Sequence, residues 1–393
     1  DQNFIGYPNL TFQRLDYDFT DEHIYCGTNS LQSRFAFLNG AARRVFGKPF
    51  QISEFNFTYP APNRSEGGLI YPAMAALQDW DGLYRFCHAN RQDLILSPET
   101  GLEMFDLVND PVRNIPARIA GMIFLRRDGA PAAESVVTAV GYESSLEPFL
   151  RSYPPNSVAV LFSAQVGSAA VSPDGKSFLN PIPKKTTGIV DISTEYKPNG
   201  EIPVLNASDD EAMAAFARKH GYARHAAEDK VTSSTGEIKV DFPKGVFQLS
   251  TPRTEGFYFD RKGNAAGNVL SVETDSPATV AATSLDGKNL PDSARVLLIH
   301  VTDMQNEGTV YTDESMRTII KDVIKQRPVT ILFRSAQAAI TFKTNLANPM
   351  LYALDCSGKR IGKVEFTRNG KNIAFRAVTD RNGTACFAYE LAN

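Results

Sequence analysis

The pattern of apolar and polar positions changes character near residue 130. Before that point, short apolar runs alternate with stretches of helical periodicity. The runs cover 19–26, 49–56 and 82–89, and the helical stretches cover 30–47 and 68–80. A strand–helix–strand order is typical of parallel strands joined by right-handed crossovers. The first part of the chain is therefore expected to be α/β.

Three polar or aromatic residues stand at equivalent places in the three expected strands. His23, Glu54 and Phe86 are 31 and 32 positions apart, and one βα unit usually occupies about 30 residues. Because side chains at the carboxyl ends of parallel strands meet at one edge of a sheet, these residues are expected to lie near one another.

From about residue 155 onward the apolar positions alternate with polar ones, and turn residues separate the runs. This alternation is typical of antiparallel strands and predicts one or two β-sandwiches. The runs cover 157–166, 237–252, 268–290, 294–303, 329–345 and 350–391. A helix is expected at 208–222, with Ser208 as its N-cap and Gly221 at its end. The proline-rich stretch 179–203 is expected to be an irregular surface loop.

Three short motifs in the first part resemble one enzyme family. The stretches DEHIY (21–25), ISEFN (52–56) and ALQDWDGLYRF (76–86) look like the C-terminal part of the (β/α)8 barrel of clan A retaining glycoside hydrolases. Residues 105–131 resemble the segment that leaves such a barrel for β-sandwich modules in large galactosidase-like and cellulase-like enzymes. The resemblance covers about a third of the chain.

The resemblance implies a domain organisation. Residues 1–130 would be the C-terminal part of a TIM barrel, residues 131–320 a β-sandwich with a helical insertion, and residues 321–393 a small C-terminal β-sandwich. The expected fold class is thus α/β plus all-β.

Glu54 is the central candidate for catalysis. The resemblance implies that this glutamate is the nucleophile, and that His23 or Tyr25 orients it. The residue pattern points the same way, because a carboxylate at the end of a parallel strand projects where barrel enzymes keep their catalytic groups. The amide of Asn56 is a further donor that could keep the carboxylate ionised, and Asn56 is also expected to contact the substrate. The alternative is a structural carboxylate paired with Arg44 or Arg64.

Substrate contacts are expected from residues around the second and third strands. Trp80 and Tyr84 could form an aromatic platform for a sugar ring, although core packing is the alternative for Trp80. Arg64 lies in the loop after the second strand, where ligand contact competes with a solvated surface position. His88 follows the third strand and is a candidate for binding substrate hydroxyls.

A retaining hydrolase needs a second carboxylate as the acid/base. In the family this glutamate precedes the strand matched by His23 by two βα units or more, and only 22 residues precede His23. Three parallel strands also cannot close a barrel. We therefore expect that a second polypeptide supplies the N-terminal part of the barrel, or that the chain is a fragment of a longer enzyme.

Composition narrows the classes of partner and cofactor. The chain has 393 residues and a net charge of −3, with scattered basic residues, so nucleic acid is not an expected partner. No run reaches the roughly 20 apolar residues of a membrane span. Residues 1–10 show no signal-peptide pattern, so such a peptide would be absent or already removed. The compartment stays open, with a periplasmic or secreted location favoured.

The four cysteines have no spacing typical of a metal site, and no metal is expected. Cys356 and Cys386 could pair, or both could be free thiols. Two carboxylates and water suffice for glycoside hydrolysis, so no cofactor is expected either. The rival to the enzyme hypothesis is a non-catalytic carbohydrate-binding or structural protein with a degenerate barrel.

Overall fold

The computed structural model describes most of the chain and gives the positions of its strands and helices. The described ranges are 10–27, 29–35, 37–38, 43–96, 100–146, 158–193, 195–197, 200–206, 209–222, 226–227, 229–313, 316, 318–321 and 328–393.

The first part of the chain forms a parallel sheet, as its pattern predicts. Strand β1 (Thr20–Cys26) and strand β3 (Gly82–Arg85) both pair in parallel with β2 (Phe50–Phe57). We call this the first parallel sheet. The predicted pairing of strand ends is confirmed, because His23 lies opposite Glu54 and the Phe86 amide donates to the Phe55 carbonyl at 3.0 Å.

The described residues of 30–47, where a helix is predicted, form no α-helix: they form turns, short 3-10 pieces at 37–38 and 43, and a bridge at Val45. Arg34 and Phe35 have φ angles of 47° and 60°, in the left-handed region that interrupts a right-handed helix. Phe35 is buried and packs against the rings of Phe37 and Phe162. Core packing by this side chain therefore outweighs the helical periodicity.

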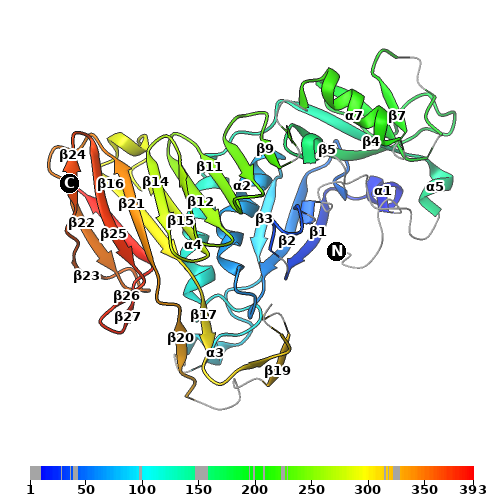
Figure 1. The fold of residues 1–393 in the computed structure, drawn as a ribbon. Helices are drawn as coiled ribbons and strands as arrows, with labels where there is room; N and C mark the ends of the chain where they lie inside the picture. The colour runs from blue at the N-terminus through cyan, green and yellow to red at the C-terminus, as the bar shows by residue number, and fades with distance from the viewer. Residues whose placement is uncertain are drawn as a thin grey trace.

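Helices cover one side of the first parallel sheet. Helix α2 (Ile70–Leu77) lies in the predicted stretch 68–80, and α4 (Pro111–Phe124) packs against it. Asp110 caps α4 by accepting from the Val112 amide at 3.0 Å, and proline occupies the first helical position. The outer side of α4 contacts three later strands, so the helices lie between two sheets (Figure 1). These strands are β12 (Thr254–Phe259), β15 (Ala278–Ser284) and β16 (Arg295–Val301).

Residues 134–206 differ from the prediction. The strands there run parallel, in the order β5-β4-β6-β7, and the predicted strand at 157–166 begins instead as helix α6 (Val158–Leu161). The stretch 179–203, predicted to be a loop, contains β6. The strands of this second parallel sheet are β4 Glu134–Val140, β5 Ala164–Ala170, β6 Thr186–Asp191 and β7 Val204–Asn206. Strand β4 is buried at every position after Glu134, which fits a parallel sheet covered on both sides.

Helix α7 (Asp210–Lys219) follows the second parallel sheet where a helical insertion is expected. Its N-cap is Asp209, whose carboxylate accepts from the Ala212 amide at 2.9 Å. The predicted N-cap, Ser208, lies outside the described residues. Gly221 follows the end of the helix with a φ of 74°, which suits a glycine.

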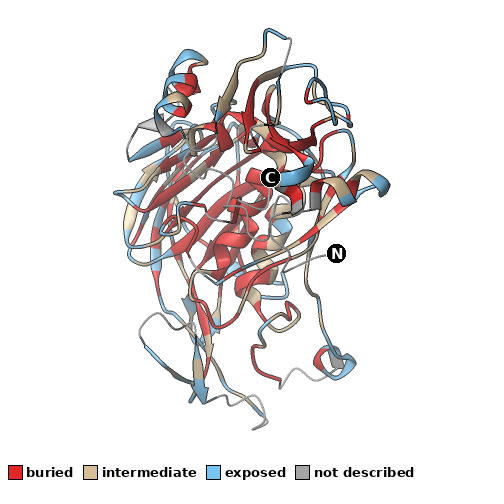
Figure 2. Ribbon diagram, turned by 90° about the vertical axis from the view of Figure 1, so that its right-hand side faces the viewer, coloured by how far each residue is buried: buried red, intermediate tan, exposed pale blue. Residues whose placement is uncertain are grey.

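The C-terminal half is largely antiparallel β-structure, as predicted. A large antiparallel sheet has the order β23-β22-β28-β16-β15-β12-β11-β10-β9-β8, and an outer antiparallel sheet has the order β13-β14-β21-β25-β24. Apolar side chains from both sheets pack into one core between them. Figure 2 shows how the buried segments concentrate in the middle of the molecule.

The bounds in the large antiparallel sheet are β8 Ala226–Ala227, β9 Lys230–Thr232, β10 Ile238–Asp241, β11 Val246–Ser250, β12 Thr254–Phe259, β15 Ala278–Ser284, β16 Arg295–Val301, β22 Met350–Leu354, β23 Arg360–Lys363 and β28 Ala388–Ala392. Those in the outer antiparallel sheet are β13 Gly263–Ala266, β14 Leu270–Thr274, β21 Gln337–Lys343, β24 Thr367–Asn369 and β25 Asn372–Val378.

Short elements complete the described structure. Three small pairs are β17 Met304–Asn306 with β20 Ile331–Phe333, β18 Val310–Tyr311 with β19 Ile319–Lys321, and β26 Asp380–Arg381 with β27 Thr384–Ala385. The remaining helical pieces are α1 Leu10–Gln13, η1 Arg14–Asp16, η3 Arg64–Gly68, α3 Gln92–Leu96, α5 Tyr142–Leu146 and η5 Leu290–Asp292.

The fold class is therefore mixed: α/β in the first half and largely antiparallel β in the second. Both antiparallel sheets combine strands from either side of residue 320, where the sequence suggests a boundary between two sandwiches. The division into domains and the origin of the first parallel sheet in a TIM barrel stay predictions.

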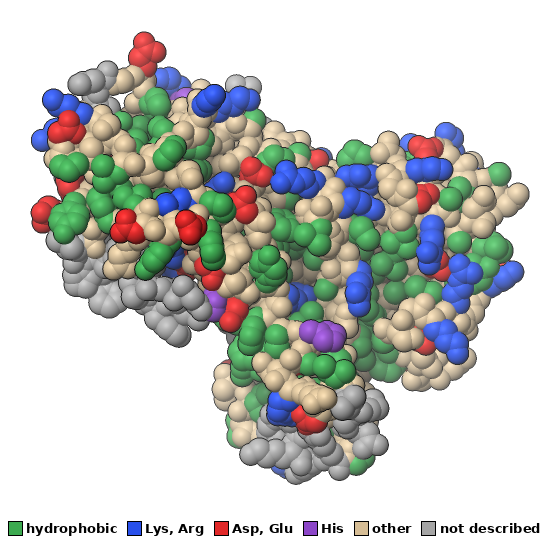
Figure 3. Space-filling model, turned by 180° about the vertical axis from the view of Figure 1, so that it is seen from behind, with side chains coloured by type: hydrophobic (Ala, Val, Ile, Leu, Met, Phe, Trp, Pro, Cys, Tyr) green, Lys and Arg blue, Asp and Glu red, His purple; other side chains and the backbone are tan. Residues whose placement is uncertain are grey.

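The surface charges, the helix lengths and the cysteines do not indicate a particular partner. Basic and acidic side chains are interspersed on the face seen in Figure 3. Within the described ranges, each helix is too short or too polar to cross a membrane. All four cysteines are free thiols, including Cys356 and Cys386.

Candidate functional site

A β-bulge in β2 determines where Glu54 points. Phe50 contacts the Trp80 ring on the side covered by helices, and Phe55 stacks on Tyr71 of α2 with ring centres 4.5 Å apart. In a regular strand, residues five apart face opposite sides. Strand β2 holds one extra residue between Ile52 and Phe55 relative to both of its neighbours. The bulge therefore moves Glu54 to the side opposite the helices.

We call this side of the first parallel sheet the open face. Asp21, His23 and Tyr25 alternate along β1 and lie opposite Gln51, Glu54 and Asn56 of β2. Paired residues in a sheet share a face, so these polar side chains gather on the open face. Solvent reaches it, because Tyr25 on β1 is 37 % exposed and Tyr84 on β3 is 57 % exposed.

Two side chains approach the Glu54 carboxylate. The Tyr25 hydroxyl donates a hydrogen bond to Glu54 Oε2, and His23 Nδ1 lies 3.2 Å from the same oxygen. The His23 side chain is 6 % exposed and that of Glu54 is 27 % exposed. The carboxylate is thus held at one oxygen and remains partly open to solvent.

Asp21 lies on the far side of His23. Its Oδ2 atom is 3.9 Å from His23 Nε2, and its two oxygens accept from the Ser53 amide at 2.9 Å and from the Ser53 hydroxyl at 2.6 Å. The imidazole of His23 therefore stands between two carboxylates, those of Asp21 and Glu54.

The environment keeps Tyr25 in its protonated form. Burial raises the pKa of the Tyr25 hydroxyl well above its usual value, and the hydrogen bond to Glu54 and the negative charge there raise it further. Burial likewise raises the pKa of the nearby Cys87 thiol to about 11, with the Asp106 carboxylate adding to the effect. Tyr25 is therefore a hydrogen-bond donor to Glu54 at neutral pH.

An aromatic wall stands beside this group. The Phe105 ring contacts Tyr25 with centres 5.3 Å apart and Phe86 with centres 5.7 Å apart. The Phe105 carbonyl accepts from Asn56 Nδ2 at 2.9 Å. Asn56 also donates to the Phe86 carbonyl and is fully buried. Asn56 thus anchors the segment that carries Phe105, and its contact with a substrate stays a prediction.

Arg64 is buried rather than solvated and does not reach the open face. Its guanidinium pairs with Asp110 at 2.7 Å and with Asp303 at 2.6 Å. Arg44 donates to the Gln78 carbonyl at 2.8 Å. Neither arginine is the partner of Glu54, so the alternative of a structural Glu54–arginine pair is wrong.

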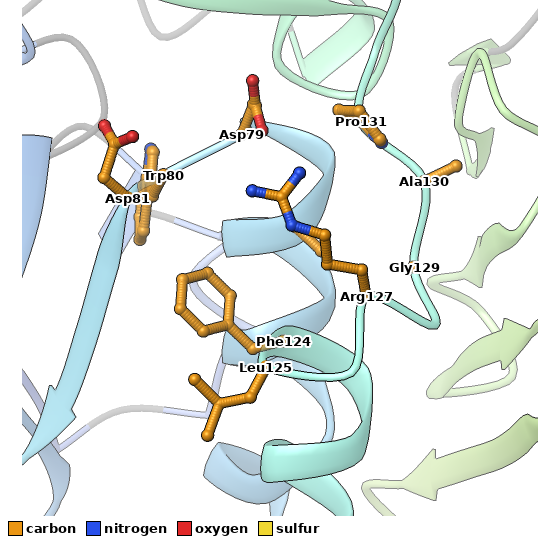
Figure 4. Close-up of a pocket in the computed structure, with 10 residues that line it drawn as sticks. Asp79, Trp80, Asp81, Phe124, Leu125, Arg127, Gly129, Ala130 and Pro131 are labelled. Atoms are coloured by element: carbon orange, nitrogen blue, oxygen red, sulfur yellow. The ribbon is translucent and has the colours of Figure 1, made fainter. Parts of the chain in front are cut away.

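Trp80 lies at the other end of the strands, where β3 begins. The side chain is 3 % exposed and packs against Phe50 and Tyr71, as its core alternative predicts. It lines a cavity of about 390 Å³ together with Asp79 and Arg127 (Figure 4). Of the expected substrate contacts, Tyr84 lies on the open face, and His88 is exposed in the loop after β3.

The arrangement suits a carboxylate that acts as a nucleophile or as a hydrogen-bond acceptor. A charge-assisted hydrogen bond from a hydroxyl orients such a group and stabilises its ionised form. In the described ranges, no group of three or more His, Cys, Asp and Glu side chains is arranged to hold a metal ion.

Sequence reasoning missed Asp21, Ser53 and Phe105. The signal for Asp21 was present, because positions 21, 23 and 25 share one face of a strand. The hydrogen bonds between Ser53 and Asp21 depend on the bulge, and the contact of Phe105 with Tyr25 depends on the path of a loop. Neither feature produces a periodic pattern in the sequence.

Comparisons with known proteins leave the family open. The chain matches no family model and no curated protein. Among solved structures, the chain described as "Structure of Rhamnosidase from Novosphingobium sp. PP1Y" is 10 % identical, with a TM-score of 0.25. The match covers 96 % of the present chain and 35 % of that chain. The present chain thus spans about a third of the rhamnosidase's length, and a TM-score this low carries no argument about fold or activity.

Proposed function

We propose that the chain supplies the nucleophile half of a retaining glycoside hydrolase acting on the O-glycosyl bonds of a β-linked oligo- or polysaccharide. In the first step, the Glu54 carboxylate attacks the anomeric carbon while a second carboxylic acid protonates the leaving oxygen. In the second step, water releases the sugar and the second group takes a proton from that water.

One observation carries the proposal: the Glu54 carboxylate lies on the polar face of a parallel sheet. It accepts from the Tyr25 hydroxyl and stays partly exposed. A nucleophile must be oriented and accessible, and these two features provide both conditions. His23, 3.2 Å from the same oxygen, limits the rotation of the carboxylate.

A partner supplies the second carboxylate and the remaining strands in this proposal. Parallel sheets occur with both faces covered, whereas the open face here exposes Tyr25 and Tyr84. In the described part of the chain, β1 and β3 each pair with β2 alone. The partner is a second polypeptide, or another segment of a longer enzyme, that adds βα units to these edges.

The test is a covalent trap in the complete enzyme. A 2-fluoro glycoside with a good leaving group slows the second step, so the glycosyl adduct accumulates and can be mapped by mass spectrometry. We expect the adduct on Glu54. The variant Glu54→Gln should form no adduct and lose at least about 10³-fold in kcat.

The matched control is Glu273→Gln, at an exposed position of β14 on the outer antiparallel sheet. This variant should keep both adduct and activity. An adduct on any other residue, or undiminished activity in Glu54→Gln, would refute the role of Glu54.

The second candidate is carbohydrate binding without catalysis. Asp21 is the other carboxylate near Glu54 on the open face, but both of its oxygens accept hydrogen bonds from Ser53. Asp21 is therefore not available as the acid/base that catalysis requires, which favours binding alone. Binding of an oligosaccharide by the complete protein without turnover or adduct would support this candidate.

A further inference from the structure

We propose that Asp21 is a positioning residue that holds the bulge of β2 and thereby aims Glu54. The inference rests on the proposed function for its consequence in catalysis, but its structural part stands on the geometry alone.

The bulge residue is Ser53, because β2 passes from Ile52 opposite Glu22 to Glu54 opposite His23. Ser53 therefore has no counterpart in β1. Its amide donates to Asp21 Oδ1 at 2.9 Å and its hydroxyl donates to Asp21 Oδ2 at 2.6 Å. The carboxylate of Asp21 thus supplies hydrogen-bond acceptors to Ser53, the residue that has no paired residue in β1.

The direction of Glu54 depends on this single extra residue. A strand without the bulge would place position 54 on the same side as Phe50 and Ile52, which are fully buried on the side covered by helices. A carboxylate there would lose its solvent and its partner Tyr25. Releasing the bulge therefore turns a usable nucleophile toward an apolar layer.

Asp21 also reaches Glu54 through His23. Asp21 Oδ2 lies 3.9 Å from His23 Nε2, and His23 Nδ1 lies 3.2 Å from Glu54 Oε2. The carboxylate of Asp21 is thus close to both features that position Glu54, namely the bulge at Ser53 and the imidazole of His23. Asp21 makes no contact with a substrate in this proposal and acts through Ser53 and His23.

The first measurement follows hydrogen exchange at the Ser53 amide, which requires no activity. Asp21→Ala removes the acceptor of the Ser53 amide. The exchange rate of this amide should therefore rise at least about tenfold, which corresponds to the loss of one charge-assisted hydrogen bond. Asp21→Asn keeps a carbonyl oxygen for the amide and should stay within about threefold of the wild type. The control is Asp18→Ala, at an exposed position just before β1, which should leave Ser53 unchanged.

The second measurement is the kinetics of the complete enzyme. Asp21→Ala should lower kcat by about 10- to 100-fold with little change in KM, because a misaimed nucleophile affects the transition state. Asp21→Asn should restore a substantial part of kcat. Ser53→Ala removes only the hydrogen bond from the hydroxyl, so its kcat should lie between those of Asp21→Ala and Asp21→Asn. This variant replaces Asp21→Ala in the test if Asp21→Ala does not fold.

The results separate this inference from the proposed function. Unchanged exchange at Ser53 in Asp21→Ala overturns the inference, as does an equal loss of kcat in Asp21→Ala and Asp21→Asn. If the complete protein has no hydrolase activity, the proposed function fails, and the exchange data still decide whether Asp21 holds the bulge.

Discussion

Glu66 is a fully buried carboxyl group close to the end of β1. It accepts from the Ser30 amide at 3.0 Å and from Asn63 Nδ2 at 2.7 Å. Burial raises the pKa of Glu66 to about 8, although the hydrogen bonds from Asn63 and Ser30 act in the opposite direction. The folded protein therefore holds a proton on Glu66 that the unfolded chain releases near pH 4.5.

This difference predicts a pH dependence of stability. A group whose pKa is raised by folding contributes stability below its unfolded pKa, and that stability is lost as pH rises through the folded pKa. Between about pH 4.5 and 8, Glu66 should lower the free energy of unfolding by on the order of 4 kcal/mol. In Glu66→Gln this contribution disappears, as urea midpoints at pH 5 and pH 8 can measure.

The comparison must be made between variants. His300 is buried with its pKa lowered to about 4 by burial, so it favours the folded state as pH rises. This effect has the opposite sign and is common to wild type and Glu66→Gln. The exposed Glu211→Gln is the control and should keep the wild-type profile. A Glu66→Gln profile parallel to the wild type would contradict the prediction.

Part of the candidate site can be predicted from the sequence at the level of single residues. Glu54, His23 and Tyr25 were predicted together, because the spacing of strand ends is readable from the sequence. The structure places Arg64 and Trp80 elsewhere, since charge and aromatic character alone do not show whether a side chain faces a ligand or the core. Burial of an arginine depends on carboxylates that are distant in the sequence.

At the scale of elements, helices with local signals were predicted best. Helix α7 has an amphipathic pattern and a capping side chain within one turn, whereas the stretch 30–47 has the pattern but becomes turns around Phe35. A helix depends mostly on contacts within four residues, but a buried aromatic side chain can override them.

The cap of α7 provides a local test. Asp209→Ala removes the acceptor of the Ala212 amide and should cost about 1 kcal/mol. Faster hydrogen exchange should appear in the first turn of α7 and leave β12 unchanged. Glu211→Ala, in the same turn but without a capping bond, is the matched control and should have the smaller effect. Equal exchange in the two variants would show that the cap contributes nothing.

The direction of strands was the weaker part of the prediction. Residues 131–320 were expected to form an antiparallel β-sandwich, but the strands between 134 and 206 run parallel. Short apolar runs do not distinguish the two arrangements, because direction follows from the path of the connections rather than from the strand itself.

At the scale of the whole molecule, a buried ionic network joins the α/β part to the β-rich part. Arg64 of η3 pairs with Asp110, the N-cap of α4, and with Asp303, which follows β16. Arg113 of α4 pairs with Asp110 as well, at 2.7 Å. Segments more than 200 residues apart in the sequence thus share one buried charge cluster.

Removing Arg64 should destabilise the whole protein. Arg64→Met leaves Asp303 without its closest cation and should cost about 3–5 kcal/mol, as expected when one partner of a buried ion pair is lost. Thermal unfolding should show a lower Tm. The matched control, Arg91→Met, removes an exposed arginine that pairs with Asp93 and should leave the Tm close to that of the wild type, because solvent screens exposed ion pairs. Similar Tm values for both variants would contradict the structural role of Arg64.

The sequence by itself determined the α/β class of the first 130 residues, the largely antiparallel β class of the C-terminal half, and the grouping of His23, Tyr25 and Glu54, because periodicity and strand spacing are local properties of the chain. Only the tertiary structure decided that Glu54 faces the open side, that residues 134–206 form a parallel sheet, and that Arg64 is buried. These features depend on a one-residue bulge, on the paths of connections and on charge partners distant in the sequence, and such contacts exist only once the chain has folded.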